Sequence, residues 1–429
     1  MAIHISKYLQ KHWKNHGCKV YTTLDQGVVS GFAFILQLLL AGWLGISVFG
    51  TFTILWIAVL LLNNVNQALV TFPMMTLRTR QVNPKQYTFA VAILQGLLLP
   101  IYTLLLFIAK ILAFPLFHIE LNNTTFYAFV SMALGYQIYE FLRKSYFSDQ
   151  KFKNSLFLDL GTISIQIIAL LFLYISDRME LQNILLALST SYVLSFVLVC
   201  CNASPLNLNV IVHTFRKHWQ FGSWLLATST IQWLSGNFVF LFTGSIVGNA
   251  AVGILKIGQS LVGAITFLFQ VVENYLPPKA SAIYQKSDME GLWSEMQLTM
   301  RKLGVLVILF ATLIAALAYP MASWLFSDEV ANHYHIYQGF ALWAILFFPT
   351  FIYRIGFRTI EKNHFIFMAF SFHIILSALL SILLIPNEGL EGAIWTMILA
   401  KTGMVVFYVI AFHIHRKSNI NPERIYLSK

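Results

Sequence analysis

The sequence predicts an all-α polytopic membrane protein of about twelve transmembrane helices, and three observations carry this prediction. Of 429 residues, 58% are hydrophobic and only 10% are charged, whereas a soluble globular chain carries about 25% charged residues. The charges gather in short clusters between apolar runs of roughly 20 residues, the helix length that crosses about 30 Å of hydrocarbon. Strongly and weakly basic loops also alternate along the chain, as in multi-pass membrane proteins.

Each predicted span is an apolar run that ends at charge, proline or glycine. The spans lie at residues 22–42, 48–72, 88–113, 124–142, 155–175, 182–201, 220–242, 250–276, 303–326, 335–356, 364–385 and 390–413. Because a polar gap follows the sixth span, we expect an N-terminal lobe over residues 1–205 and a C-terminal lobe over residues 206–429, each with six helices.

The 28 lysines and arginines predict the orientation of the spans. When they are sorted between alternate loops, 23 fall on one side, only Arg178 falls on the other, and four lie within spans. Cytoplasmic loops collect basic residues, and an odd number of spans would scramble this bias. We therefore expect an even number of spans and both termini in the cytoplasm. The stretch before the first span lacks a small-residue cleavage site, which predicts a retained cytoplasmic arm and not a signal peptide.

A repeated glycine spacing predicts two related halves. Gly45 and Gly50 lie between the first two spans, and Gly248 and Gly253 lie between the seventh and eighth, 203 residues later (248 − 45). Glycine at these places suits tight external turns between helices that approach closely. Two unrelated glycine-rich turns are the alternative. We favour two six-helix lobes related by a pseudo-two-fold axis, since such repeats are common in transporters.

Several function classes find no support in the sequence. The three cysteines, Cys18, Cys200 and Cys201, predict neither a disulfide framework nor a metal site. The net charge of +11 is spread over small clusters between spans, so no nucleic-acid partner is expected. There is no Walker loop, HExxH, nucleophile elbow or strand-turn-helix GxGxxG, which argues against an enzyme and against a cofactor. A polytopic membrane enzyme, such as a polymerase, ligase or acyltransferase, remains a less favoured alternative, because the predicted external loops are short.

Basic residues inside the spans are the first candidates for substrate binding. A charge at the bilayer centre costs roughly 2.5–3.5 kcal/mol, so it needs water or a partner. Lys401 lies about ten residues into its span, about 15 Å deep, and we expect it to be a cation in a polar cavity that pairs with an anionic substrate group. A structural ion pair with a carboxylate is the alternative. Lys256 and Arg354 are further binding candidates nearer to span ends, where long side chains reach the headgroups.

Four carboxylates lie in spans close to their predicted cytoplasmic ends, and we consider them candidates for proton coupling. They are Asp25, Glu140, Asp159 and Glu273. Glu140 precedes Arg143 and Lys144 by three and four residues, so a local ion pair on one helix face is the simpler interpretation for it. Asp25 and Glu273 have no cation within a turn of their own helix, which favours a cavity-facing or titrating role.

The order of several short motifs resembles a known family. The matching segments are Leu24-Asp25-Gln26-Gly27, Trp43-Leu44-Gly45 with Phe49-Gly50, Tyr139-Glu140-Phe141-Leu142-Arg143-Lys144, Phe221-Gly222, Pro277-Pro278 and Gly389-Leu390-Glu391-Gly392-Ala393. Across essentially its whole length the chain resembles the oligosaccharide-lipid flippases (Wzx type, O-antigen and exopolysaccharide export). Their superfamily also contains multidrug and toxin extruders.

The resemblance implies transport of an undecaprenyl-diphosphate-linked oligosaccharide from the cytoplasmic to the outer leaflet of the bacterial inner membrane by alternating access. It implies lipid-linked oligosaccharide and membrane lipids as partners, with a polysaccharide polymerase or glycosyltransferases as further ones. A multidrug or organic-cation antiporter of the same superfamily is the alternative function. A drug-cation site would need net negative charge, whereas Lys256 and Lys401 favour an anion.

Overall fold

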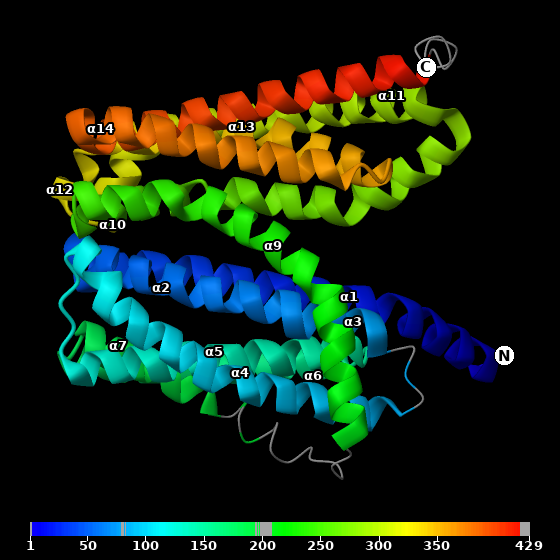
Figure 1. Ribbon diagram of the computed structural model, residues 1–429, viewed down its shortest axis with the longest axis horizontal. Coiled ribbons are helices and arrows are strands. Elements are labelled where there is room, and N and C mark those ends of the chain that lie inside the picture. Colours follow the sequence, from blue (N-terminus) through cyan, green and yellow to red (C-terminus); the bar gives the residue numbers. More distant parts are fainter. Residues whose placement is uncertain are drawn as a thin grey trace. The chain divides into compact units, whose positions relative to one another are not determined.

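The computed structural model describes residues 2–420 apart from 79, 80, 82, 194, 196 and 198–207. The side chains of residues 2–20, 264, 266–268, 270, 271, 273, 274, 329 and 417–420 are also outside the description. Every regular element in the described part is a helix (Figure 1). The predicted all-α class is therefore confirmed. The chain divides into two compact units, unit 1 (Met1–Leu39 and Leu55–Thr230) and unit 2 (Leu40–Ile54 and Ile231–Lys429).

Unit 1 contains most of the first half of the chain. Its elements are α1 (Ala2–Leu44) as far as Leu39, the end of α2 (Ile46–Asn66), the π-helical turn η1 (Gln67–Thr71), α3 (Phe72–Leu77), α4 (Pro84–Leu112), the 3-10 helix η3 (Phe114–Phe117), α5 (Asn123–Ser148), α6 (Phe152–Ile175), α7 (Leu181–Ser191), and α9 (Leu208–Ile246) as far as Thr230. Helices α4, α6 and α7 pack around α5. The side chains of Asn83 and Asn122 cap α4 and α5 by accepting backbone N–H bonds from Gln86 and Thr125.

Unit 2 contains the rest of α9, α10 (Asn249–Leu261), α11 (Gly263–Leu325), α12 (Asp328–Ala331), α13 (Tyr334–Thr359) and α14 (Asn363–Ile420). Helix α13 lies between α11 and α14 (Figure 1). Two of these helices are interrupted. The backbone of α11 leaves helical geometry at Ser287 and Asp288, and α14 does so at Gly389, where φ is 56°. Helix α14 therefore contains two of the predicted spans, one on either side of the break, whereas α11 contains the second half of the eighth predicted span and the ninth up to Leu325.

Eight helices are long and apolar enough to cross a membrane by length and composition, counted over the described residues. The difference from twelve has local causes. Helix α14 covers two predicted spans, the eighth predicted span is divided between α10 and α11, α5 contains many polar as well as charged residues, and the second half of the sixth predicted span lies mostly outside the described residues. The prediction of two six-helix lobes divided near residue 205 stays a prediction.

Large apolar side chains cover the outer faces of the helices. Ile168, Phe172 and Ile175 of α6 are 67–81% exposed, and Ile111 of α4 is 70% exposed. Exposed apolar patches of this kind are unusual on a soluble monomer but are expected where a helix faces lipid. The chain is therefore a multi-pass membrane protein.

Candidate functional site

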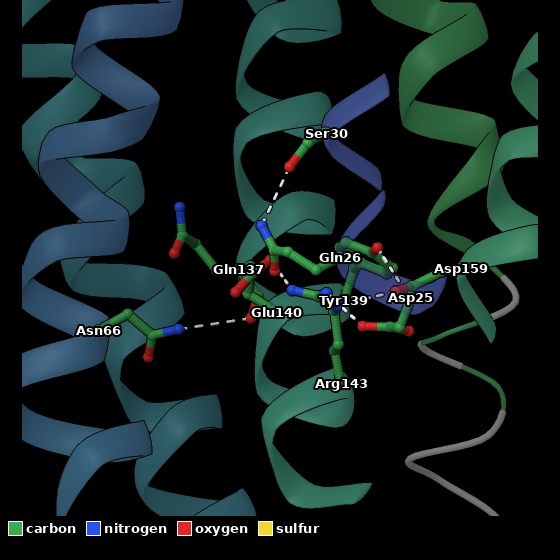
Figure 2. A network of polar contacts seen from close by, with 9 residues as sticks. All are labelled: Asp25, Gln26, Ser30, Asn66, Gln137, Tyr139, Glu140, Arg143 and Asp159. Atoms are coloured by element: carbon green, nitrogen blue, oxygen red, sulfur yellow. Dashed lines mark hydrogen bonds and ion pairs between the residues drawn. The ribbon is translucent and has the colours of Figure 1, made fainter. Parts of the chain in front are cut away.

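A buried cluster of charges in unit 1 is centred on Arg143. This residue lies on α5 and is 5% exposed. Its Nη2 donates to Asp25 Oδ2 of α1 at 2.6 Å, and its Nε donates to Asp159 Oδ2 of α6 at 2.8 Å. Figure 2 shows both carboxylates beside the guanidinium. One arginine thus ties three helices together.

Two further residues of α5 complete this cluster. The hydroxyl of Tyr139 donates to Asp159 Oδ1 at 2.6 Å, and Glu140 Oε1 lies 3.8 Å from Arg143 Nη1. These residues lie one turn or less from Arg143, so the helix places them on neighbouring positions. Glu140 has the longest of the three ion-pair distances. The predicted local pair between Glu140 and Arg143 is present but is the weakest contact of the cluster.

The charges of this cluster do not balance. Asp25, Glu140 and Asp159 are buried, being 1%, 7% and 0% exposed, and together they face a single guanidinium. An uncompensated buried charge is expensive, and a carboxyl group usually avoids that cost by taking a proton. The Oδ1 atom of Asp25 also has no hydrogen-bond partner among the described residues. The arrangement is therefore suited chemically to binding and releasing a proton.

Buried amides lie beside the cluster. Asn66 Nδ2 donates to the carbonyl of Gln137 at 3.5 Å (Figure 2). Gln137 Nε2 donates to the carbonyl of Val59 at 3.3 Å. The Asn66 Oδ1 and Gln137 Oε1 oxygens have no partner within the described residues. Buried polar groups normally find partners or ordered water, so this side of unit 1 is polar enough to be hydrated.

Lys401 occupies a different environment in unit 2. It lies in the second half of α14 and is 6% exposed. Its Nζ lies 5.6 Å from the ring centroid of Trp343 and 5.3 Å from that of Phe347, and it donates weakly to Met404 Sδ at 3.8 Å. No described carboxylate lies within ion-pair distance of this amine. Aromatic faces attract a cation without neutralising it, so the amine keeps its capacity to bind an anion.

Two other polar residues lie near Lys401. The charge of Arg354 on α13, whose guanidinium stacks 4.9 Å from the Phe351 ring, is close enough to repel that of Lys401. The charge of Lys401 also interacts electrostatically with His373 of α14. His373 is 5% exposed, its Nδ1 lies 2.7 Å from Ser235 Oγ of α9, and its Nε2 has no partner among the described atoms. This part of unit 2 is electropositive.

The remaining candidates are Lys256 and Glu273. Lys256 on α10 is half-buried, and its Nζ donates to Gln259 Oε1 at 2.8 Å. The side chain of Glu273 lies outside the described residues. The structure thus brings Asp25, Glu140 and Asp159 together in one unit and places Lys401 near Arg354 in the other.

Sequence reasoning missed two residues. Arg143 was predicted only as a local partner of Glu140, although the clustering of carboxylates near cytoplasmic span ends was a signal for a shared cation. His373 was given no role in the prediction of the substrate site. Neither its proximity to Lys401 nor its bond to Ser235, 138 residues away in the sequence, is visible without the fold.

Comparison with known proteins agrees with this description. A family model described as "Polysaccharide biosynthesis protein" matches residues 39–334. No curated protein matches the chain. Among solved structures, an inward-facing multidrug resistance MATE family transporter of the MOP superfamily aligns with a TM-score of 0.70 at 10% identity, over 94% of this chain and 98% of that chain.

Two further solved structures have the same fold. The lipid II flippase MurJ in an inward closed conformation aligns with a TM-score of 0.66 at 12% identity, over 96% of this chain and 92% of that chain. A MOP superfamily transporter from Pyrococcus furiosus aligns with a TM-score of 0.60 at 11% identity, over 94% and 96% of the two chains. These solved proteins are transporters and a flippase, not enzymes, in agreement with the prediction that the chain is no enzyme.

Proposed function

Because the chain belongs to the polysaccharide biosynthesis protein family and has the fold of MOP superfamily transporters, we propose that it is a flippase for a lipid-linked oligosaccharide. It moves an undecaprenyl-diphosphate-linked repeat unit from the cytoplasmic to the outer leaflet of the bacterial inner membrane, by alternating access, for synthesis of a surface polysaccharide such as O-antigen or exopolysaccharide. Both termini then lie in the cytoplasm. A polymerase and glycosyltransferases act on the same repeat unit.

The environment of Lys401 is the observation that supports an anionic substrate. A buried amine near the middle of a span, held against Trp343 and Phe347 without a described carboxylate, retains hydrogen-bond donors for a further group. A diphosphate offers several charged acceptor oxygens, and charge-assisted bonds of this kind are stronger than neutral ones. The nearby charge of Arg354 favours the same partner. Lys256 is a second, less buried contact for the substrate.

Replacement of Lys401 tests this proposal. Lys401→Gln should abolish surface polysaccharide while membrane abundance stays normal, and Lys401→Arg should retain part of the activity, because arginine keeps the charge but changes its geometry. The measurements are surface polysaccharide on whole cells and protein abundance in membranes. Lys110→Gln is the matched control, since Lys110 also lies over an aromatic ring, 4.5 Å from Phe126, but is bound to Asn123 at an exposed position.

Wild-type export by Lys401→Gln would contradict the binding role. A loss of abundance or of thermal stability in Lys401→Gln that is restored by neutralising a nearby carboxylate would instead identify a structural ion pair. Glu273 is the carboxylate to neutralise first, because it is the one in-span carboxylate candidate that does not belong to the cluster around Arg143.

The cluster around Arg143 is the proposed site of proton coupling. Its excess of carboxylates favours a bound proton, and movement of α1 or α6 relative to α5 would change the Arg143 contacts and so the affinity for that proton. We expect Glu140→Gln, which neutralises the weakest partner, to leave the protein folded but to remove the dependence of export on the proton gradient. Glu290→Gln is the control, because Glu290 pairs with Arg416 at an exposed position. Export by Glu140→Gln that still follows the gradient would contradict this assignment.

An organic-cation antiporter is the second candidate function, and the carboxylates of unit 1 are the observation that favours it. Such a site would need carboxylates available to a ligand, whereas Asp25 and Asp159 are engaged by Arg143 at 2.6 and 2.8 Å. Growth of cells in toxic lipophilic cations separates the two functions. An antiporter protects cells in a manner that depends on Asp25 and not on Lys401.

A further inference from the structure

The two repeated glycine turns have the same backbone construction. Gly45 joins α1 to α2 with φ of 73°, and Gly248 joins α9 to α10 with φ of 108°. Residues with side chains rarely adopt these φ values. In each case the next residue, Ile46 or Asn249, begins the following helix. The distribution of basic residues predicts that both turns lie on the external side of the membrane.

These two turns contact each other directly within unit 2. A Cβ atom added to Gly50 of α2 would overlap the backbone carbonyl of Asn249 and would lie 3.1 Å from the nitrogen of Gly253. A Cβ atom added to Gly253 of α10 would overlap the backbone carbonyl of Ile46. Each glycine therefore packs against the backbone of the first residue of the opposite helix, Asn249 or Ile46. Asn249 Nδ2 also donates to Thr51 Oγ1 at 3.2 Å.

The contact explains why residues Leu40–Ile54 belong to unit 2, while residues 1–39 and 55–230 belong to unit 1. The turn between α1 and α2 therefore packs against α10 within unit 2, whereas the rest of each helix is assigned to unit 1. The two helix starts that meet here both carry partial positive charge from their free N–H groups, which repel one another weakly. Smooth backbone surfaces without interlocked side chains can also part without any rotamer change.

We propose that these turns form a reversible backbone latch, in which Gly50 and Gly253 close the external end of the transporter and separate when substrate leaves on that side. The glycines are required because only a residue without a side chain permits the two backbones to meet. The contact is tight enough to exclude a side chain, and it has few polar bonds to break. The latch is a property of this chain's own residues and does not depend on which substrate is carried.

A disulfide across the latch provides the first test. In a background with Cys18, Cys200 and Cys201 replaced by serine, the pair Thr51→Cys and Asn249→Cys should cross-link on oxidation. We expect oxidation to abolish export of surface polysaccharide and reduction to restore it, with neither single-cysteine variant affected. Full cross-linking with export at the wild-type level would overturn the proposal, because the contact would then be permanent.

Glycine substitutions provide a second test that needs no substrate. Gly50→Ala and Gly253→Ala should hold the turns apart, so the Thr51–Asn249 disulfide should form in lower yield and a membrane-impermeant maleimide should label Thr51→Cys several-fold faster. Gly96→Ala is the matched control, because Gly96 lies in α4 with no atom within 4 Å of an added Cβ. Unchanged yield and labelling in both glycine variants would contradict the latch.

The two tests also separate the latch from the substrate assignment. If Gly50→Ala does not accumulate in membranes, the reversible disulfide alone decides. If the cells export no polysaccharide through this protein at all, the labelling difference between Gly50→Ala and Gly96→Ala still decides for or against the latch, and only the flippase proposal fails.

Discussion

At the scale of single residues, the buried cations Arg143 and Lys401 have opposite surroundings. Arg143 is surrounded by the carboxylates of Asp25, Glu140 and Asp159 at 2.6–3.8 Å. Lys401 is surrounded by the rings of Trp343 and Phe347 and a methionine sulfur. An arginine suits the first place, since its planar fork contacts several carboxylates at once. Because the two cations differ in partners, their removal should have different consequences.

Replacing Arg143 should damage the fold more than replacing Lys401. Arg143→Gln leaves buried carboxylates without their cation, and breaking a buried ion pair in this way costs about 3–5 kcal/mol. We expect a lower thermal unfolding temperature in detergent and a lower membrane abundance. The double variant Arg143→Gln with Asp25→Asn should recover part of the loss, as coupled residues do.

Arg416 provides the comparison for this prediction. It makes a bidentate pair with Glu290 at 2.6 and 2.7 Å, but Glu290 is exposed, and such pairs contribute about 0–1 kcal/mol. Arg416→Gln should therefore unfold at almost the wild-type temperature. Equal effects of Arg143→Gln and Arg416→Gln would show that the cluster in unit 1 is not a stabilising centre.

At the scale of elements, the π-turn η1 in unit 1 has a clear structural role. The turn widens the helix between α2 and α3, and the backbone carbonyl of Leu69 within it accepts a bond from His218 Nδ1 of α9 at 2.8 Å. His218 Nε2 lies 2.8 Å from the Tyr87 hydroxyl of α4. One turn further along α9, Gly222 lies against the backbone of Ala68. The π-turn thus provides the surface on which the first half of α9 is held.

Substitution of Gly222 should weaken this attachment. A Cβ atom at Gly222 would lie 2.5 Å from the backbone oxygen of Ala68, which is too close for any real contact, so Gly222→Ala should force α9 away from η1. We expect a destabilisation of about 1–3 kcal/mol, as for overpacking elsewhere, measured as a lower unfolding temperature. Gly236→Ala, on the same helix with no atom within 4 Å of the added Cβ, should be neutral or slightly stabilising.

The sequence predicted the positions of the helices far better than it predicted the contacts between them. Span positions follow from local hydropathy, and the helix breaks at Gly45 and Gly248 follow from glycine and its backbone freedom. The partners of Asp25 and His218 do not, because they lie 118 and 131 or more residues away in the sequence. Which helices pack together depends on tertiary shape. The absence of a cation on its own helix therefore suggested that Asp25 was free, although Arg143 of α5 binds it.

At the scale of the whole molecule, topology is the most direct test of the membrane arrangement. Because 23 basic residues fall in one set of loops and one falls in the other, reporter fusions after residues 80, 150, 290 and 425 should all report the cytoplasm. Fusions near residues 120, 178, 328 and 388 should report the outside. A single inverted assignment among well-expressed fusions would contradict the twelve-span arrangement, and with it the external position of the latch.

The pairing of Asp25 with Arg143 has a consequence for the order in which the protein is made. The two residues are 118 positions apart, and ribosomes add about 5–20 residues per second, so roughly 6–24 s pass between their syntheses. During that interval α1 enters the membrane with a carboxyl group that has no cation. The nascent helix must therefore keep the Asp25 carboxyl group near the lipid headgroups or in contact with water until α5 is inserted. Biogenesis of the first helix is therefore complete only when the fourth predicted span has joined it.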